Sequence, residues 1–562
     1  MSTARSAKAR FAPTLIAGCL GVFVAQVAYS LPASILGTIQ TDLGISGADL
    51  TWVSAAFATA MVIFELTFGV VGDIFGRKQL LLGGLAVLAA GEIVTIMGAD
   101  NVHSLWIGQA IAGIGAGALY PISLTMIAAA APDAKARANA IALWAGFLSI
   151  GAAVSPITAG ALAENGHWKE SFWIPAALAA VAFVVALAAR NSSAPEGRKL
   201  DIPGQLTLII GLVSLIWALT QGSEIGYGEG SIIAGLVIGA VFLVAFVMIE
   251  LRTESPLIHL SLFRNRSFAI TGITAVIGMF AYLATCFSMT MFLGSVIHIG
   301  AVWIGVLFLI IQVPALILVP VVARLIHSVS PRWVLTAGFL FIAAAAFWSS
   351  TFDAHDFLTD RGAPDDGAWT TFIAPMVLNG IGFALTVGSI TAVAINSVPM
   401  RLAGMASATT NLLRDFGFAL GPVLGGAIYN SIANHQLDKA IGGAVAESGL
   451  TDPAAIGTVM GINDQAGAIA LNSLPVIPGP EGQPPLGPMP ASIHDAAFTA
   501  LSDAFNQTWL VASLCALAAA ILTGIGLAGA KSGAEESADA ESAATLGTDG
   551  IHQVAGVAND LA

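Results

Sequence analysis

Ionisable residues inside long apolar stretches are the groups of this chain whose type and position could do chemistry. Glu65 lies in the apolar stretch 50–72, and Arg414 and Asp415 lie well inside the stretch 404–430. A charge at membrane depth is costly, so it marks a candidate site for a proton, an ion or a substrate. Neighbouring residues of a helix diverge by about 100°, so Arg414 and Asp415 need not pair with each other. We predict a coupling or substrate role for all three, with a structural hydrogen bond as the alternative for Glu65.

Neutral amides in other apolar stretches form a second set of candidate groups. They could line a polar cavity, although each of them alone is more often a hydrogen bond between two helices. The set consists of Gln26, Gln109, Gln312, Asn379, Asn396 and Asn411.

The composition of the chain is that of a membrane protein. Of its 562 residues, 56% are apolar and only 10% are charged, whereas a soluble chain carries roughly 25% charged residues. The three cysteines lie in apolar stretches without disulfide or metal-ligand spacing, so we predict no cofactor and no metal. The net charge of −13 resides in loops and in the tail after Lys531, which gives no indication of a nucleic-acid partner.

Fourteen segments have the roughly 20 apolar residues that a helix needs to cross a bilayer. Of the 21 lysines and arginines, seventeen fall in loops on one side, three on the other and one inside a span. Basic residues gather in cytoplasmic loops, so we expect both ends of the chain in the cytoplasm. We expect the spans near residues 14–36, 50–72, 79–98, 104–130, 138–162, 171–189, 203–222, 231–251, 268–296, 302–325, 332–352, 371–396, 404–430 and 508–530.

The chain repeats itself weakly. Residues 113–115 and 380–382 both read Gly-Ile-Gly, and a proline follows nineteen residues after the first glycine of each. Repeated halves of a transporter place the substrate site between them near the midplane. The expected organisation is a cytoplasmic N-terminus (1–13), an N-terminal six-helix bundle (14–189), two inserted helices with linkers (190–267), a C-terminal six-helix bundle (268–530) that includes a long outer loop (431–507), and a disordered cytoplasmic tail (531–562).

The loop between the second and third spans carries a compact motif. Residues 69–78 read Gly-Val-Val-Gly-Asp-Ile-Phe-Gly-Arg-Lys. Its glycines allow close helix packing, and its aspartate can meet a helix N-terminus or a cation. One interpretation is a basic turn that only follows the positive-inside rule, and the other is a latch that biases two conformations. The latch residues would be Gly69, Asp73, Gly76, Arg77 and Lys78.

Two spans combine small residues at four-residue spacing with a proline. Small residues let helices approach each other, and the proline permits a kink. Ordinary tight packing is the alternative interpretation for the spacing alone. The residues are Gly151, Ser155, Pro156 and Gly160 in the fifth span, and Gly417, Gly421, Pro422, Gly425 and Gly426 in the thirteenth.

These patterns resemble those of the major facilitator superfamily. The loop motif resembles its GxxxDxxGRK signature, and the Gly-Pro spans resemble the GxxxGPxxGG signature of its antiporter branches. Fourteen spans with a long loop before the last one resemble its fourteen-helix drug:proton antiporters, which include pumps for quaternary ammonium compounds and tetracyclines. The resemblance implies that Arg137 pairs with the loop motif and that Glu92, in a peripheral third span, has a lesser role.

The sequence departs from that family at two positions. Ala28 stands where the first span usually carries an aspartate, and Gln109 stands where the fourth span usually carries an arginine linked to proton transfer. A replacement route would use Glu65 or Asp415. The expected function is export of amphiphilic small molecules by alternating access, coupled to protons.

Other functional classes are kept as alternatives. They are an uncoupled facilitator or lipid-moving transporter, and a transporter-like sensor or scaffold. The chain has no phosphate-binding loop and no nucleophile–base set, which disfavours an enzyme. Beyond a small amphiphilic substrate, protons and membrane lipid, no partner is predicted, and the expected location is a bacterial cytoplasmic membrane.

Overall fold

The computed structural model describes residues 2–45, 47–193, 200–254, 256–358, 365, 367–398, 403–479 and 484–528. Within those ranges, fourteen helices are long and apolar enough to cross a membrane. Backbone groups find no water in hydrocarbon, so each spanning segment must satisfy its hydrogen bonds within a helix. The predicted all-α membrane protein with fourteen spans is confirmed. The predicted tail 531–562 lies outside the described residues.

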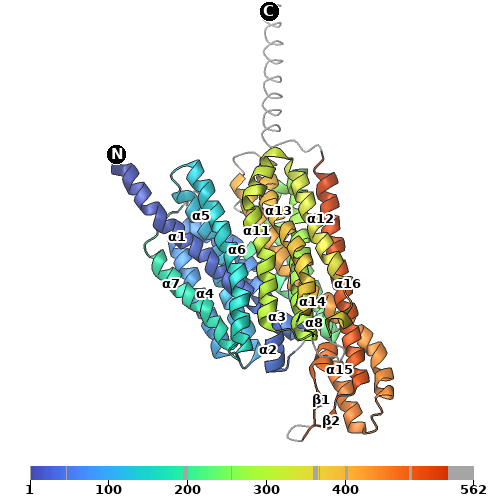
Figure 1. Cartoon of the computed structure of the whole chain (residues 1–562). Helices are drawn as coiled ribbons and strands as arrows, with labels where there is room; N and C mark the ends of the chain where they lie inside the picture. Colours follow the sequence, from blue (N-terminus) through green and yellow to red (C-terminus); the bar gives the residue numbers. More distant parts are fainter. Residues whose placement is uncertain are drawn as a thin grey trace, which may run out of the picture.

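The N-terminal bundle contains six long helices (Figure 1). Helix α5 packs against α3, α4 and α1, while α7 covers α4 and α1. The bounds are α1 Ser2–Ser30, α3 Gly47–Phe75, α4 Arg77–Met97, α5 Val102–Ala130, α6 Ala134–Glu164 and α7 Trp173–Ala186.

The C-terminal bundle contains six further long helices, and two inserted helices precede it in the chain. Helix α10 packs on α14 and α16, α12 packs on α13 and α16, and the inserted α8 and α9 pair with each other. The bounds are α8 Ile202–Ile225, α9 Gly230–Glu250, α10 Arg266–Met291, α11 Ala301–Ser328, α12 Pro331–Ser349, α13 Ile373–Asn396, α14 Ala403–Glu447 and α16 Ala491–Gly526.

The first predicted span, 14–36, is broken rather than continuous. Helix α1 ends at Ser30, a 3-10 turn covers Leu31–Ser34, and the short helix α2 covers Leu36–Leu43. Pro32 has no backbone N–H and stands at the start of the 3-10 turn, where a missing donor is tolerated. At its other end α1 begins at Ser2, so the predicted N-terminal segment 1–13 is largely helical.

The segment 431–507, predicted as a long outer loop with room for short helices, is mainly helical. Helix α14 continues to Glu447, and α16 already begins at Ala491. Between them lie α15 (Pro453–Ser473) and a short antiparallel hairpin of β1 (Val476–Ile477) and β2 (Gly487–Pro488). These elements project from the end of the molecule opposite to the N-terminus (Figure 1). We call this end the α15 face, and the end with Arg77 and Lys78 the basic face.

The two bundles meet along two seams, each made by equivalent helices. Helix α6 packs on α11, and α14 packs on α3. In each seam the fifth long helix of one bundle meets the second long helix of the other. The seams are therefore related as expected for two copies of one six-helix unit.

Candidate substrate and coupling site

A cavity of about 330 Å³ lies between the two bundles. Helices α1, α3, α5 and α6 line it from one side, and α10, α11, α13 and α14 line it from the other. Most of its wall is apolar, with aromatic side chains in both halves. Such a cavity suits a small molecule with a large apolar part and a few polar groups. The aromatic members of the wall are Tyr29, Tyr120, Trp144, Tyr282, Phe308, Phe383 and Phe418.

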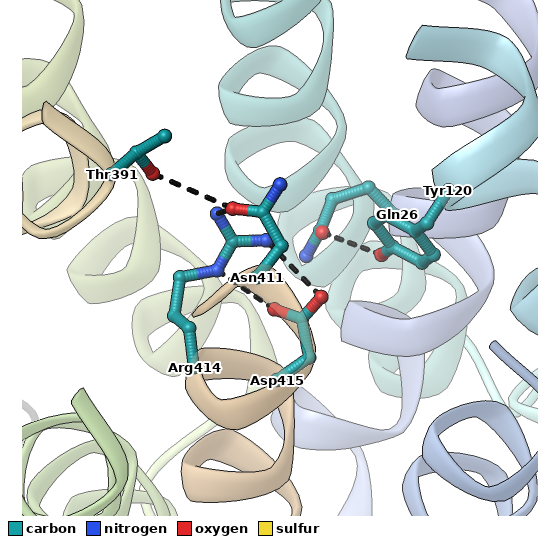
Figure 2. A network of polar contacts seen from close by, with 6 residues as sticks. All are labelled: Gln26, Tyr120, Thr391, Asn411, Arg414 and Asp415. Carbon is teal, nitrogen blue, oxygen red and sulfur yellow. Dashed lines mark hydrogen bonds and ion pairs between the residues drawn. The ribbon is translucent and has the colours of Figure 1, made fainter. Parts of the chain in front are cut away.

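The N-terminal wall holds a short chain of hydrogen bonds. The Tyr120 hydroxyl donates to Gln26 Oε1 at 2.8 Å (Figure 2). Gln26 Nε2 in turn donates to the Ser30 hydroxyl at 2.8 Å. Both amide ends of Gln26 are thereby oriented toward fixed partners. The predicted polar lining is thus present at Gln26, which borders the cavity.

The C-terminal wall holds a buried ion pair on one helix. Arg414 donates through Nε to Asp415 Oδ1 at 2.8 Å and through its terminal nitrogen to Oδ2 at 3.1 Å. A third bond runs from Arg414 to Asn411 Oδ1 at 3.3 Å (Figure 2). Neighbouring residues of a helix need not pair, but these two do, because the arginine side chain is long enough to fold back to the next residue. Two-point pairing fixes the plane of the carboxylate.

Glu65 faces this ion pair from the opposite bundle. It is 7% exposed, and its side chain lies within electrostatic reach of Asp415 and Arg414. One of its carboxyl oxygens is buried without a hydrogen-bond partner. Two carboxyls and one guanidinium therefore meet at the α3–α14 seam, where movement of one bundle against the other changes their separation.

Other predicted residues lie away from the cavity. Gln109 is fully buried in the N-terminal bundle, where its Nε2 donates to Glu92 at 3.4 Å and to Thr95 at 3.3 Å. Asn379 contacts Cys286 at 3.3 Å inside the C-terminal bundle. These three helix-to-helix contacts match the alternative interpretation of buried amides.

Gln312 and Asn411 lie at the site itself. Gln312 lines the cavity, and its Nε2 approaches the Tyr282 hydroxyl at 3.5 Å. Asn411 accepts a hydrogen bond from Arg414 through its Oδ1 at 3.3 Å. Sequence reasoning missed Tyr282, whose ring stacks on Phe383 with centroids 4.5 Å apart. The rarity of tyrosine, with 5 in the whole chain, was the one available signal.

The Gly-Pro helices close the cavity toward the α15 face. A Cβ atom at Gly160 would stand 2.5 Å from the Ala301 carbonyl oxygen, so α6 touches the backbone of α11 there. The Ser34 hydroxyl donates to the Pro156 carbonyl at 2.7 Å, which ties the broken first span to the same point. The cavity lining continues from this closure toward the basic face, as far as Val322.

Helix α14 makes the equivalent close contacts in the other half. A Cβ at Gly417 would stand 2.5 Å from the Val276 carbonyl of α10, and one at Gly426 would stand 2.7 Å from the Thr51 hydroxyl of α3. Small residues at these points let the seams form without a gap.

We expect Gly160→Ala to impair transport strongly. The added methyl meets backbone that cannot rotate away, and overpacking of this kind costs about 1–3 kcal/mol. That cost falls on the state closed toward the α15 face. The measurement is initial transport rate together with thermal unfolding in detergent. Gly146→Ala on the same helix is the matched control, because nothing lies within 4 Å of its Cβ position. Equal rates for both variants would contradict the assigned contact.

The basic-face turn after α3 is held by ionic and backbone contacts. Arg77 pairs with Asp73 at 2.8 Å, and Lys78 Nζ donates to the Leu187 carbonyl at 2.5 Å. The backbone N–H of Arg77 also donates to the Ser192 carbonyl at 2.9 Å. Gly76 has φ +108°, a conformation that requires glycine. These contacts join the turn to the segment after α7.

Arg137 is exposed near the start of α6. Its pairing with the turn remains a prediction, because the Asp73 ion pair found here is made with Arg77.

We expect Arg77→Gln to slow transport by about tenfold, the effect of removing roughly 1.4 kcal/mol of bias between two conformations. Arg77→Lys should retain most of the rate, since it keeps the charge opposite Asp73. Rates in proteoliposomes at matched protein content make the comparison. A loss as large in Arg77→Lys as in Arg77→Gln would show that the charge is not what matters.

Two repeated bundles around a central cavity define the class of alternating-access membrane transporters. The family model "Major Facilitator Superfamily" matches residues 18–422. The chain belongs to the Major Facilitator Superfamily, as its loop motif indicated.

Relatives in the same family are named for resistance and export. The chain is 29% identical to the multidrug resistance protein Stp of Mycobacterium tuberculosis over 75% of each chain. It is 26% identical to the tetracenomycin C resistance and export protein of Streptomyces glaucescens over 91% of each chain. It is 27% identical to the multidrug export protein EmrB of Escherichia coli over 72% of this chain and 78% of that one.

Solved structures share the fold. The POT family transporter PepTSo superposes with a TM-score of 0.57 at 15% identity, over 92% of this chain and 98% of that one. At this identity the likeness concerns the fold alone.

Proposed function

We propose that this chain exports amphiphilic small molecules by proton-coupled antiport. The carrying observation is the cavity between the bundles, with an apolar aromatic wall and the cluster of Glu65, Arg414 and Asp415 at one seam. The names of Stp, the tetracenomycin exporter and EmrB support drug-like substrates. The position of the chain in the bilayer follows its charges: the basic face lies in the cytoplasm of a bacterial cell, and the α15 face lies outside.

The coupling chemistry is an exchange of charge partners at the α3–α14 seam. When the cavity opens toward the basic face, Glu65 and Asp415 compete for the single positive charge of Arg414. A proton on one carboxyl removes the repulsion between them, and a cationic or dipolar substrate can do the same. Binding of proton and substrate is then mutually exclusive, which is the requirement for antiport.

The cluster replaces the charges that the family usually carries elsewhere. Ala28 is buried in the N-terminal bundle, and Gln109 bonds to Glu92 away from the cavity. Neither position offers a charge to the substrate site, so coupling depends on Glu65 and Asp415.

The test is substrate flux in proteoliposomes that hold the purified chain, with and without an imposed pH gradient. Lipophilic cations and uncharged amphiphiles serve as substrates. Flux that follows the gradient supports antiport. Flux that ignores the gradient would replace the proposal with an uncoupled or lipid-moving transporter, and absence of flux for every amphiphile would overturn export.

A further inference from the structure

Helix α8, the first of the two inserted helices, lies directly behind the charged cluster. It packs on α3 and on α14, the two helices that form the seam containing Glu65 and Asp415. Its inner face buries Leu208 and Leu212 together with Ile63 of α3. Further along, Ile216 packs with Ala55 of α3 and Val423 of α14. Helix α8 therefore fills the groove where the two bundles meet.

The opposite face of α8 is apolar and exposed. Leu206 is 54% exposed, Val213 is 43% exposed, and Ile210 and Trp217 are exposed to a similar extent. In a spanning helix such a face contacts lipid. Helix α8 thus lies between the hydrocarbon of the bilayer and the seam that contains the charged cluster.

The polar contacts of α8 are directed to α3. Gln205 Nε2 donates to the Ile63 carbonyl at 3.0 Å, and its Oε1 accepts from the Thr67 hydroxyl. Ile63 and Thr67 stand two positions before and two positions after Glu65 in α3. At the other end of α8, Glu224 accepts from the backbone N–H of Ala48 at 2.6 Å, where a carboxylate is favourable beside the N-terminus of α3. In the described part of the chain, the contacts of α8 with α14 are apolar packing.

This arrangement makes Gln205 a positioning residue for Glu65. The Gln205 side chain donates to the Ile63 carbonyl and accepts from the Thr67 hydroxyl. It therefore fixes the rotation of the helical turn that contains Glu65. The charged and titratable groups around Glu65 are Asp415 and Arg414 on α14 and Tyr120 on α5. Helix α8 adds no charge at this level, because its one ionisable residue, Glu224, is nineteen positions away.

We propose that the inserted helix α8 moves with the N-terminal bundle, holds the turn that presents Glu65 to Asp415 through Gln205, and shields Glu65 from lipid. The directed polar contacts attach α8 to α3, and the apolar contact lets α14 slide past it. The role in coupling rests on the proposed function, whereas the shielding does not.

The shielding is tested with dicyclohexylcarbodiimide, a carboxyl reagent that partitions into bilayers. The purified full chain in liposomes is treated with the reagent, and modification of Glu65 and Glu92 is measured by mass spectrometry. Leu208→Ala and Gln205→Met should both raise the labelling rate of Glu65 several-fold. Glu92 is the internal reference, because it is fully buried and accepts its hydrogen bond from Gln109 of α5. Gln221→Met, toward the other end of the same helix, should label like the unaltered chain.

Unchanged labelling of Glu65 in both variants would overturn the shielding. Faster labelling of Glu92 together with Glu65 would indicate general loosening and would also count against it. This arm needs no transport, so it decides the proposal even if gradient-driven flux is absent and the proposed function fails.

The positioning role is tested by the pH profile of gradient-driven flux. Gln205→Met should lower the rate several-fold and change the pH profile toward that of Glu65→Gln, with the apparent KM for substrate within a factor of two. In a Glu65→Gln background, Gln205→Met should have no further effect on the profile. Independent, additive effects of the two substitutions would overturn the positioning role.

Discussion

Glu65→Gln is expected to abolish substrate accumulation driven by a pH gradient. Glutamine keeps the size and the hydrogen-bonding capacity of the side chain, but it cannot exchange a proton. A gradient of about two pH units supplies about 2.7 kcal/mol per coupled proton, which corresponds to roughly hundredfold accumulation. The variant should show accumulation near unity, while exchange of labelled for unlabelled substrate without a gradient continues. Steady-state uptake into proteoliposomes provides the measurement.

Glu92→Gln is the matched control for this experiment. Glu92 is another buried carboxyl in the same bundle, but it bonds to Gln109 and not to the cluster at the seam. It should leave accumulation unchanged. If Glu65→Gln retained full accumulation, and the combination with Asp415→Asn did so as well, proton coupling through this cluster would be wrong.

Asp415→Asn is expected to destabilise the protein strongly. It removes the carboxylate that holds Arg414 through two contacts of 2.8 and 3.1 Å, and it leaves a buried guanidinium without its ion-pair partner. Loss of one partner of a buried pair costs about 3–5 kcal/mol. Thermal unfolding in detergent should show a large fall in melting temperature, and transport should fall with it.

The double variant Arg414→Gln, Asp415→Asn separates stability from transport. Removal of both charges leaves no buried guanidinium without its partner, so we expect most of the stability to return. Transport should remain low, because the cluster with Glu65 is gone. Asp503→Asn, at an exposed position of α16, serves as the charge-loss control. A single Asp415→Asn variant as stable as this control would show that the ion pair contributes little.

The spans could be predicted because the bilayer forces one local solution. A stretch such as 231–251 has to be a helix if it is to cross hydrocarbon, and its structure spans Gly230–Glu250. The prediction for the segment 431–507 was incomplete because that segment lies outside the hydrocarbon, where the backbone is not forced into a helix. Helix α14 runs to Glu447 and α16 starts at Ala491, because outside the membrane a helix needs only packing, and the Pro/Gly-rich composition of the predicted loop obscured it.

The candidate site could be predicted in part. Glu65, Arg414 and Asp415 stood out because a charge in an apolar helix is visible in the sequence itself. Their meeting was not predictable, since Glu65 and Asp415 are 350 positions apart and lie on helices of different bundles. The same holds for Gln109, whose sequence context matches that of a cavity residue but whose side chain turns to Glu92.

The sequence by itself determined the number of spans, the repeated halves and the family, and it predicts the orientation of the spans, because these depend on hydropathy, charge and local motifs. The tertiary structure alone decided which polar groups share the cavity, how Arg414 pairs, and that α8 packs against both α3 and α14. The physical reason is that every spanning helix is apolar around most of its circumference. Hydropathy therefore cannot tell which face turns to lipid and which to another helix, and that choice rests on side-chain packing across the two bundles.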